Sequence, residues 1–232
     1  MIQIHAIARR MTGLAVACAM LSFGAMVHAQ QAAPAPTVSA DEALAIALGN
    51  QPLAPERVAL GGRFVKAIHM DSGMHDTVAF AFDPIRGQVL GGLPANAPPA
   101  RKAAFIAALD EALAGLKKDL DVKMMTGLAR YYAASVDDKT LGEAVKFYES
   151  PLGQKVLAPG EPQTEAEKQA IGEYALAHVE VLDVFSSSTR AGEVPAAIMA
   201  RERATMLSTF KLRLCQSLKR RGVAMPSCTA AS

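Results

Sequence analysis

Hydrophobic residues recur every three or four positions along most of this chain, which is the spacing of amphipathic helices. The pattern is clearest in residues 141–157, where it is broken once, at Ser150-Pro151. Proline disfavours helical geometry in the preceding residue but suits the first turn of a new helix, which a serine hydroxyl can cap. The sequence therefore predicts a helical corner. Gly153 lies in the second helix, and a helical glycine, which costs about 1 kcal/mol, usually marks the close approach of another backbone.

Similar patterns predict helices on both sides of the corner. The expected ranges are Ala40–Leu48, Pro55–His69 with a weak centre at Gly61-Gly62, Arg101–Ser135, a helix opened by Thr164, and Pro195–Arg221. Thr77–Phe82 fits a helix or a strand, and its neighbours favour a helix, which we expect Pro84 and Gly87 to interrupt. Asp119 and Asp121 mark a candidate kink in the longest helix.

Capping residues predict where these helices begin, and apolar faces predict which of their sides face the core. Ser39 with Glu42 and Thr164 with Glu167 have the capping-box spacing, and Asp137 or Asp138 is expected to cap the helix before the corner. A core-facing stripe is expected after Thr164, at Ile171, Tyr174, Ala175, His178, Leu182 and Phe185. On the last helix we expect an inward face made of Met199, Met206, Phe210, Leu214 and Leu218.

The first 29 residues have the features of a signal peptide. Arg9 and Arg10 precede an apolar run, and cleavage is expected after Ala29. Acylation of Cys18, as in a lipoprotein, is the weaker alternative, and the apolar run is shorter than a spanning helix needs. Residues 30–38 read as an extended leader rich in proline and alanine. We therefore expect a protein exported to the periplasm of a Gram-negative-type cell.

Composition favours helices that pack on helices. Half of the chain is apolar, 51%, yet it has no tryptophan and few aromatic residues. We expect an all-α fold: residues 39–232 form one bundle-like domain of stacked helical hairpins. Cys215 and Cys228 remain after signal cleavage, and in an oxidising compartment they predict a disulfide. Free thiols and an intermolecular bridge are the alternatives.

The corner also carries a family pattern. Its sequence fits F-Y-x-S-P-x-G-x-K, with the matching residues Phe147, Tyr148, Ser150, Pro151, Gly153 and Lys155. This pattern resembles the signature of the DUF2059 family of bacterial envelope proteins, over about residues 123–157. The resemblance implies an all-helical exported domain of unknown function, with no catalytic residues to carry over. We expect the motif to serve packing, with a ligand or partner site as the alternative. Residues 185–192 form a weak echo of the corner.

Candidate chemistry is sparse. The common hydrolase, zinc and nucleotide-binding motifs are absent, so we expect neither an enzyme nor a cofactor. The best metal candidates are His69, Met70, Met74 and His75, whose imidazoles and thioethers suit copper. The simpler interpretation is an ordinary loop between two helices. His178, on an apolar stripe, is expected to be a buried histidine with a hydrogen bond, and Glu149 a solvated helix end.

Charge is distributed unevenly along the chain. From Ala196 onward there are seven basic residues and one acidic residue, Glu202. Such a helix either pairs with acidic residues elsewhere in the chain or meets an anionic membrane surface, and the compartment argues against nucleic acid. We expect a non-enzymatic envelope protein that binds a protein partner or the membrane surface through helical faces. The alternative is a periplasmic protein that binds a small molecule or copper.

Overall fold

The computed structural model describes residues 38–94, 96–158, 162–181, 184, 190–225 and 228. The helices with assigned bounds are α2 (Ala40–Ala47), α3 (Pro55–Ala67), α4 (Met70–Gly91), α5 (Pro99–Ser135), α6 (Asp138–Glu149), α7 (Pro151–Leu157), α8 (Glu165–Ala177) and α10 (Glu193–Arg220). The described residues contain no strand, and the all-α prediction is confirmed. None of the helices in this part of the chain is both long enough and apolar enough to cross a membrane.

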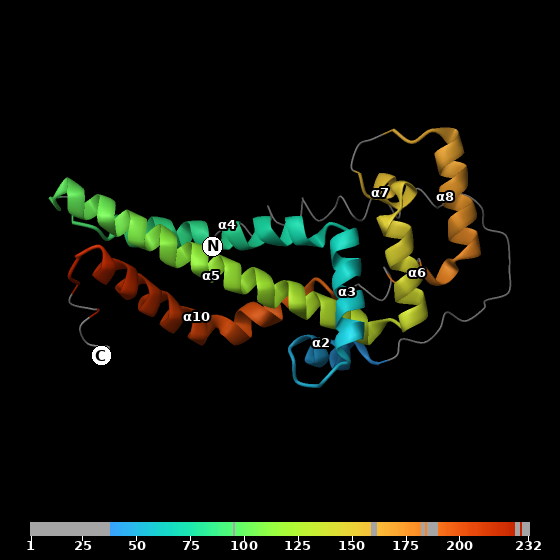
Figure 1. Ribbon diagram of the computed structural model, residues 1–232, viewed down its shortest axis with the longest axis horizontal. Helices are drawn as coiled ribbons and strands as arrows, with labels where there is room; N and C mark the ends of the chain where they lie inside the picture. Colours follow the sequence, from blue (N-terminus) through green and yellow to red (C-terminus); the bar gives the residue numbers. More distant parts are fainter. Residues whose placement is uncertain are drawn as a thin grey trace, which may run out of the picture.

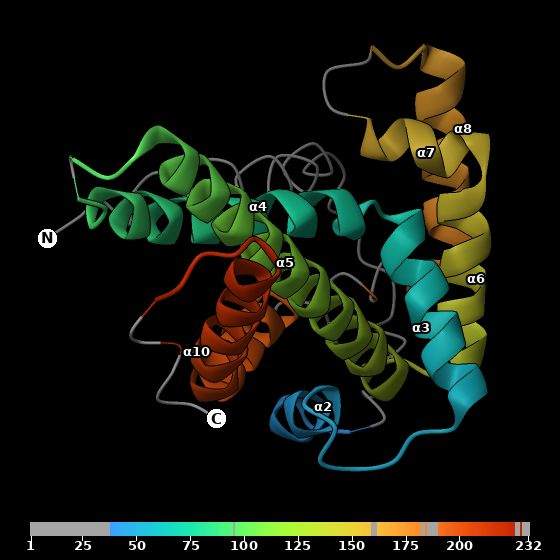
Figure 2. The same cartoon turned by 60° about the vertical axis from the view of Figure 1, so that its left-hand side comes forward.

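Helix α5 is the axis of the molecule (Figure 1). Its 37 residues span about 55 Å, and they continue through Asp119 and Asp121 without a break. Helices α2, α3, α4 and α10 all pack on α5, and α6 packs on α3 (Figure 2). At one end, the end of α4, the first half of α5 and most of α10 run side by side. We call residues 83–123 and 201–222 the arm, and the other described residues the head.

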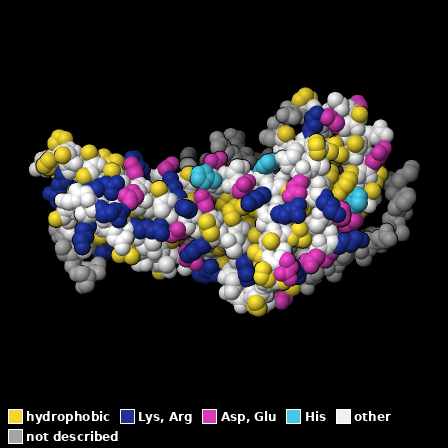
Figure 3. Space-filling view, in the orientation of Figure 1, with side chains coloured by type: hydrophobic (Ala, Val, Ile, Leu, Met, Phe, Trp, Pro, Cys, Tyr) yellow, Lys and Arg dark blue, Asp and Glu magenta, His cyan; other side chains and the backbone are white. Residues whose placement is uncertain are grey.

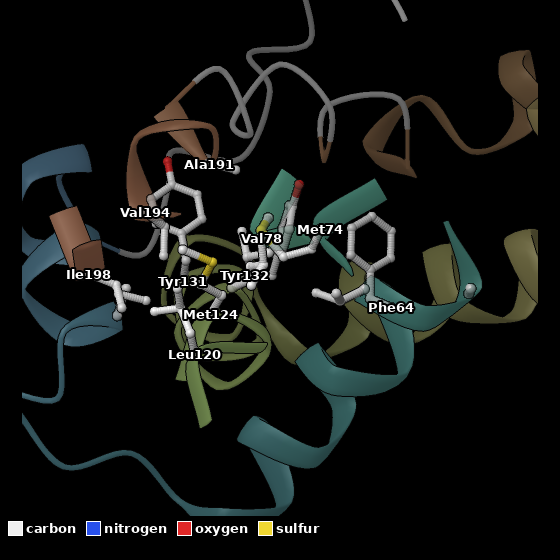
Figure 4. Packing of buried hydrophobic residues seen from close by; sticks show 14 of the residues in the cluster. Phe64, Met74, Val78, Leu120, Met124, Tyr131, Tyr132, Ala191, Val194 and Ile198 are labelled. Carbon is white, nitrogen blue, oxygen red and sulfur yellow. The ribbon is translucent and has the colours of Figure 1, made fainter. Parts of the chain in front are cut away.

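The core follows α5 and includes the region where the arm meets the head. Figure 4 shows side chains from four helices meeting there. The labelled members on these helices are Phe64 of α3, Met74 and Val78 of α4, Leu120, Met124, Tyr131 and Tyr132 of α5, and Val194 and Ile198 of α10. The rings of Phe64 and Tyr132 meet edge to face, with centroids 4.8 Å apart. Such edge-to-face pairs are a favoured aromatic geometry.

Two glycines let neighbouring helices approach α5 closely. A Cβ atom on Gly61 of α3 would collide with the backbone carbonyl oxygen of Ala129. A Cβ atom on Gly127 of α5 would lie 2.5 Å from Cδ1 of Ile198 and 3.1 Å from Cγ1 of Val194. The weak centre expected in α3 is therefore the point where α3 crosses α5.

Helix α4 differs from its prediction at both ends. It begins at Met70, so residues 70–76 are helical and do not form a loop, and the chain turns at Ile68 and His69, the latter with φ 57°. It also continues through Pro84 and Gly87 to Gly91. Proline costs a helix interior about 3 kcal/mol or more. Burial of Val78 and Phe82, which are 1% and 2% exposed, opposes this cost.

The core-facing stripe predicted after Thr164 is confirmed only in part, because its described residues are half-buried and Tyr174 packs against the core. No residue of α8 is fully buried; Ile171, Tyr174 and Ala175 are half-buried, and Leu176 is 82% exposed. The helix ends at Ala177, because His178 takes a non-helical conformation as its C-cap. The remaining stripe residues, Leu182 and Phe185, lie outside the described residues.

The predictions for the last helix and for the disulfide agree with the structure. Met199, Met206, Phe210 and Leu214 pack partly buried against the core and Leu218 is 1% exposed, so the inward face of α10 is confirmed. Cys215 and Cys228 are bonded, with an S–S distance of 1.96 Å and Cα atoms 5.4 Å apart. The predicted signal peptide and most of the predicted leader lie outside the described residues, as does most of the weak repeat at 185–192.

Candidate functional site

The helical corner forms as predicted between α6 and α7. Ser150 is in extended conformation, accepts a hydrogen bond at Oγ from the N–H of Gly153 (3.1 Å) and donates one to the carbonyl of Phe147 (2.6 Å). Pro151 occupies the first helical position of α7. A Cβ atom on Gly153 would collide with the backbone carbonyl of Phe147, so the expected close approach of another backbone is confirmed.

The two aromatic residues of the motif connect α6 to two other helices. The ring of Tyr148 lies edge to face with Phe64 of α3, with centroids 6.1 Å apart. The ring of Phe147 stacks on Tyr174 of α8 at 4.3 Å, and Tyr174 stacks on His178 at the same distance. Burial raises the pKa of Tyr148 far above its usual value, because desolvation disfavours the charged phenolate.

Lys155, the last motif residue, ties α7 to α8. Its ammonium group pairs with the carboxylate of Glu167. Glu167 also completes the predicted capping box, because its carboxylate accepts the Thr164 N–H at 2.7 Å and its own N–H donates to Thr164 Oγ1 at 3.3 Å. Hydrogen bonds from Lys155 and then from Thr164 lower the pKa of Glu167 to about 2.

Gln154 is a corner residue that the sequence did not single out. Its amide nitrogen donates to the carbonyls of Ala67 (2.9 Å) and Tyr148 (2.5 Å). Its amide oxygen lies 2.5 Å from Nε2 of His69, which therefore acts as the donor. Gln154 thus fastens α7 to the turn between α3 and α4. It occupies a variable position of the motif, so the pattern itself gave no indication of this role.

The four metal candidates do not converge. Met70 Sδ accepts a contact from the Tyr132 hydroxyl at 3.7 Å, and Met74 is buried in the core. His69 contacts Gln154, whereas His75 Nδ1 lies 2.9 Å from Asp121 Oδ2 on α5. Because α4 starts at Met70, Met70 and Met74, four residues apart, share one side of the helix, whereas His75, adjacent to Met74, lies on another side. The described residues hold no cluster of three or more His, Cys, Asp or Glu side chains suited to a metal ion.

Two other candidates occupy ordinary positions at helix ends. His178 is 35% exposed, stacks on Tyr174 and lies 3.6 Å from a carboxylate oxygen of Glu180. It is therefore less buried than its position on the stripe suggested. Glu149, at the end of α6, is exposed and forms a two-point ion pair with Arg63 of α3, at 2.7 and 3.2 Å.

A small cleft between α5 and α10 contains a charged pair. Glu202 is 9% exposed and its carboxylate lies 2.5 Å from Nζ of Lys123, and Asp119 and Thr205 also line the cleft. The hydrogen bond from Lys123 is the main cause that lowers the pKa of Glu202. The cleft leaves about 30 Å³ for water, enough for a few water molecules. The ion pair between Lys123 and Glu202 joins α10 to α5.

Some basic residues at the end of α10 form ion pairs with acidic residues of α5. Arg213 pairs with Asp119 of α5 at 2.6 Å, and Arg220 and Arg221 both pair with Glu111. The hydroxyl of Ser217 also donates to Glu111, at 2.7 Å. Hydrogen bonds from Ser217 and then from Arg221 lower the pKa of Glu111 to about 2. These contacts seat one side of α10 on the arm.

Comparison with known proteins supports the resemblance seen in the sequence. Residues 122–180 match the model of the family described as an uncharacterized protein conserved in bacteria, DUF2059. The match runs beyond the motif window of 123–157 and includes the last part of α5, from residue 122, and all of α6, α7 and α8. No curated protein and no solved structure gives a significant match. Residues 122–180 of this chain are therefore similar to the DUF2059 family, and the corner lies at the centre of the matched stretch.

Proposed function

We propose that this chain is an exported, non-enzymatic protein of the bacterial envelope that binds a protein partner or the membrane surface through its helical faces. The observation that carries the proposal is the separation of charge between arm and head. The arm carries thirteen basic and six acidic residues, and the other described residues carry nine basic and fourteen acidic ones. A molecule with such opposed ends is attracted to charged surfaces in a definite orientation.

The contacts of the DUF2059 motif support the same proposal. Its side chains are used to cap, stack and pair within the chain, as Ser150, Phe147 and Lys155 do. A motif used in this way shapes a rigid head and leaves binding to the exposed faces of the helices. The function is therefore carried by surfaces and does not require a catalytic cleft.

Export can be tested on the protein in cells. We expect the chain to be released with the periplasmic fraction, and mass spectrometry to find an amino terminus at Gln30. A protein that stays in the cytoplasmic fraction with Met1 or Ile2 at its start would contradict the proposal.

Partner binding can be tested by affinity capture from the solubilised envelope fraction. The bait is tethered through residues 30–38, so that arm and head are both free, and a denatured sample of the same chain serves as the control. We expect the folded bait to capture a defined protein or lipid that the denatured bait does not. Equal capture by both baits would refute binding through folded helical faces.

A further inference from the structure

Three basic side chains on α10 have no partner among the described residues. Arg203, Lys211 and Lys219 are exposed, and their side chains form no ion pair or hydrogen bond with the described residues. The two acidic residues of α10 do not oppose them. Glu202 is buried against Lys123, and Glu193 pairs with Arg190 at the other end of the helix.

Two leucines lie among these free bases. Leu207 is 65% exposed and Leu212 is 56% exposed. Arg203, Leu207 and Lys211 follow one another at intervals of four residues, so they form a row along the helix. Lys219 continues this row, and Leu212 lies about 100° around the helix from Lys211, on the adjoining exposed side. We call Arg203, Leu207, Lys211, Leu212 and Lys219, which together cover both exposed sides, the outer face of α10.

The surroundings of this face are basic as well. The arm carries a surplus of seven basic residues, because its thirteen bases face six acids. Figure 3 shows dark blue side chains gathered at the end of the molecule that the arm forms. Exposed Lys118 on α5 adds a further charge without a partner among the described residues.

Bases mixed with exposed leucines fit an anionic bilayer better than a purely polar partner. Lysine and arginine are attracted to anionic headgroups, by about 1 kcal/mol for each residue near the surface. Apolar side chains between them enter the boundary between headgroups and acyl chains. A polyanion in water would attract Lys211 and Lys219 equally well, but it would leave the leucines exposed to water.

We propose that the outer face of α10 lies on an anionic phospholipid bilayer, with Leu207 and Leu212 inserted and Arg203, Lys211 and Lys219 among the headgroups. This inference rests on the proposed function and names the surface that α10 binds. The arm then lies along the membrane surface, and the anionic headgroups repel the acidic head, which carries the DUF2059-like corner.

The test is co-sedimentation with lipid vesicles. It uses the protein as recovered from the producing cells, with its amino terminus read by mass spectrometry. One set of vesicles mixes phosphatidylglycerol with phosphatidylcholine, and the other contains phosphatidylcholine alone. We expect pelleting with the mixed vesicles only, and weaker pelleting as salt is raised.

Matched variants assign the binding to the outer face. Lys211→Gln with Lys219→Gln removes two charges from the arm, and Lys66→Gln with Lys139→Gln removes two exposed charges from the head. We expect the arm variant to bind the mixed vesicles about 30-fold more weakly, and the head variant to bind within about twofold of the wild type. Leu207→Ser with Leu212→Ser, which keeps every charge, should weaken binding by at least about tenfold.

Several outcomes would overturn the inference: equal pelleting with both kinds of vesicle, no pelleting with either, an equal loss in arm and head variants, or unchanged binding of the leucine variant. All substituted side chains are exposed, so far-UV circular dichroism should confirm that the variants are folded. A failure here leaves the proposed function standing if affinity capture yields a specific protein, and both fail only if that capture fails too.

Discussion

Ser150 and Gly153 make the corner possible in different ways. Ser150 supplies a hydroxyl that caps α7 and also bonds back to α6, through the carbonyl of Phe147. Gly153 contributes the absence of a side chain, which lets α7 pass against the end of α6. The first role can be read from the residue type alone. The second depends on where the chain goes next, and the sequence indicates it only through the unfavourable glycine in a helix.

Two glycine substitutions separate these effects. Gly153→Ala places a Cβ atom against the carbonyl of Phe147, and we expect it to lower the free energy of unfolding by about 2 kcal/mol. Gly142→Ala in α6 meets nothing within 4 Å, so it should leave stability unchanged or raise it by up to about 1 kcal/mol. Urea denaturation measures both. A Gly153→Ala protein as stable as the wild type would show that the approach of the two helices is not tight.

Helix ends were predictable because their chemistry is local. Ser39, Asp137 and Thr164 each accept a hydrogen bond from the N–H three residues later, as their residue types indicated. The same holds for the corner residues. Burial was less predictable, because a stripe such as that of α8 does not reveal how much of the chain covers it.

Tertiary contacts explain what the sequence did not predict. Helix α4 passes through Pro84 because Phe82, like Val78 one turn earlier, is buried against the rest of the molecule. His69 and Gln154 are 85 positions apart, and only the fold brings them together. The His and Met candidates were separated because the helix starts earlier than the polar composition of residues 69–76 suggested.

The attachment of α10 to α5 should depend on pH. The pKa of Glu111 is about 2 in the folded protein against an ordinary 4.5. Its contacts with Ser217 and Arg221 therefore stabilise the fold fully above pH 4.5, and this stabilisation is lost as the pH falls toward 2. We expect Glu111→Gln to lose less stability than the wild type between neutral pH and about pH 3, as measured by urea denaturation. Glu56→Gln, an exposed control on α3, should show the same dependence of stability on pH as the wild type. Identical pH profiles for Glu111→Gln and the wild type would contradict the prediction.

The disulfide should stabilise the end of α10. It closes a loop across a sequence separation of 13, and loss of such a loop costs about 3 kcal/mol in the chain-entropy model. We expect thermal unfolding to occur at lower temperature after reduction, as followed by circular dichroism. A protein with Cys215→Ser and Cys228→Ser should melt at the lower temperature with or without reductant. If the oxidised and reduced wild type melt together, the bond does not contribute to stability.

At the scale of the whole molecule, α5 connects arm and head into one structure. Its first half forms the arm with α4 and α10, and its second half packs on α2 and α3 and carries the tyrosines of the core (Figure 1). Close crossings at Gly61 and Gly127 fix α3 and α10 on it. A helix shared in this way should make the two parts unfold together.

The distribution of aromatic residues offers a direct test of this coupling. The chain has four tyrosines and no tryptophan, and all four tyrosines, Tyr131, Tyr132, Tyr148 and Tyr174, lie in the head. Tyrosine fluorescence therefore reports on the head, and far-UV circular dichroism reports on all helices. We expect the two urea unfolding curves to superimpose, as for a two-state protein. A second transition seen by circular dichroism alone would mean that the arm unfolds separately.

The family match begins at residue 122, partway along α5. A fragment restricted to residues 122–180 would start in mid-helix and would lack Phe64, the partner of both Tyr132 and Tyr148. The recognisable stretch is thus smaller than an autonomous folding unit. Comparisons among DUF2059 proteins, and any attempt to excise or transplant the segment, have to include the flanking helices that complete its interior.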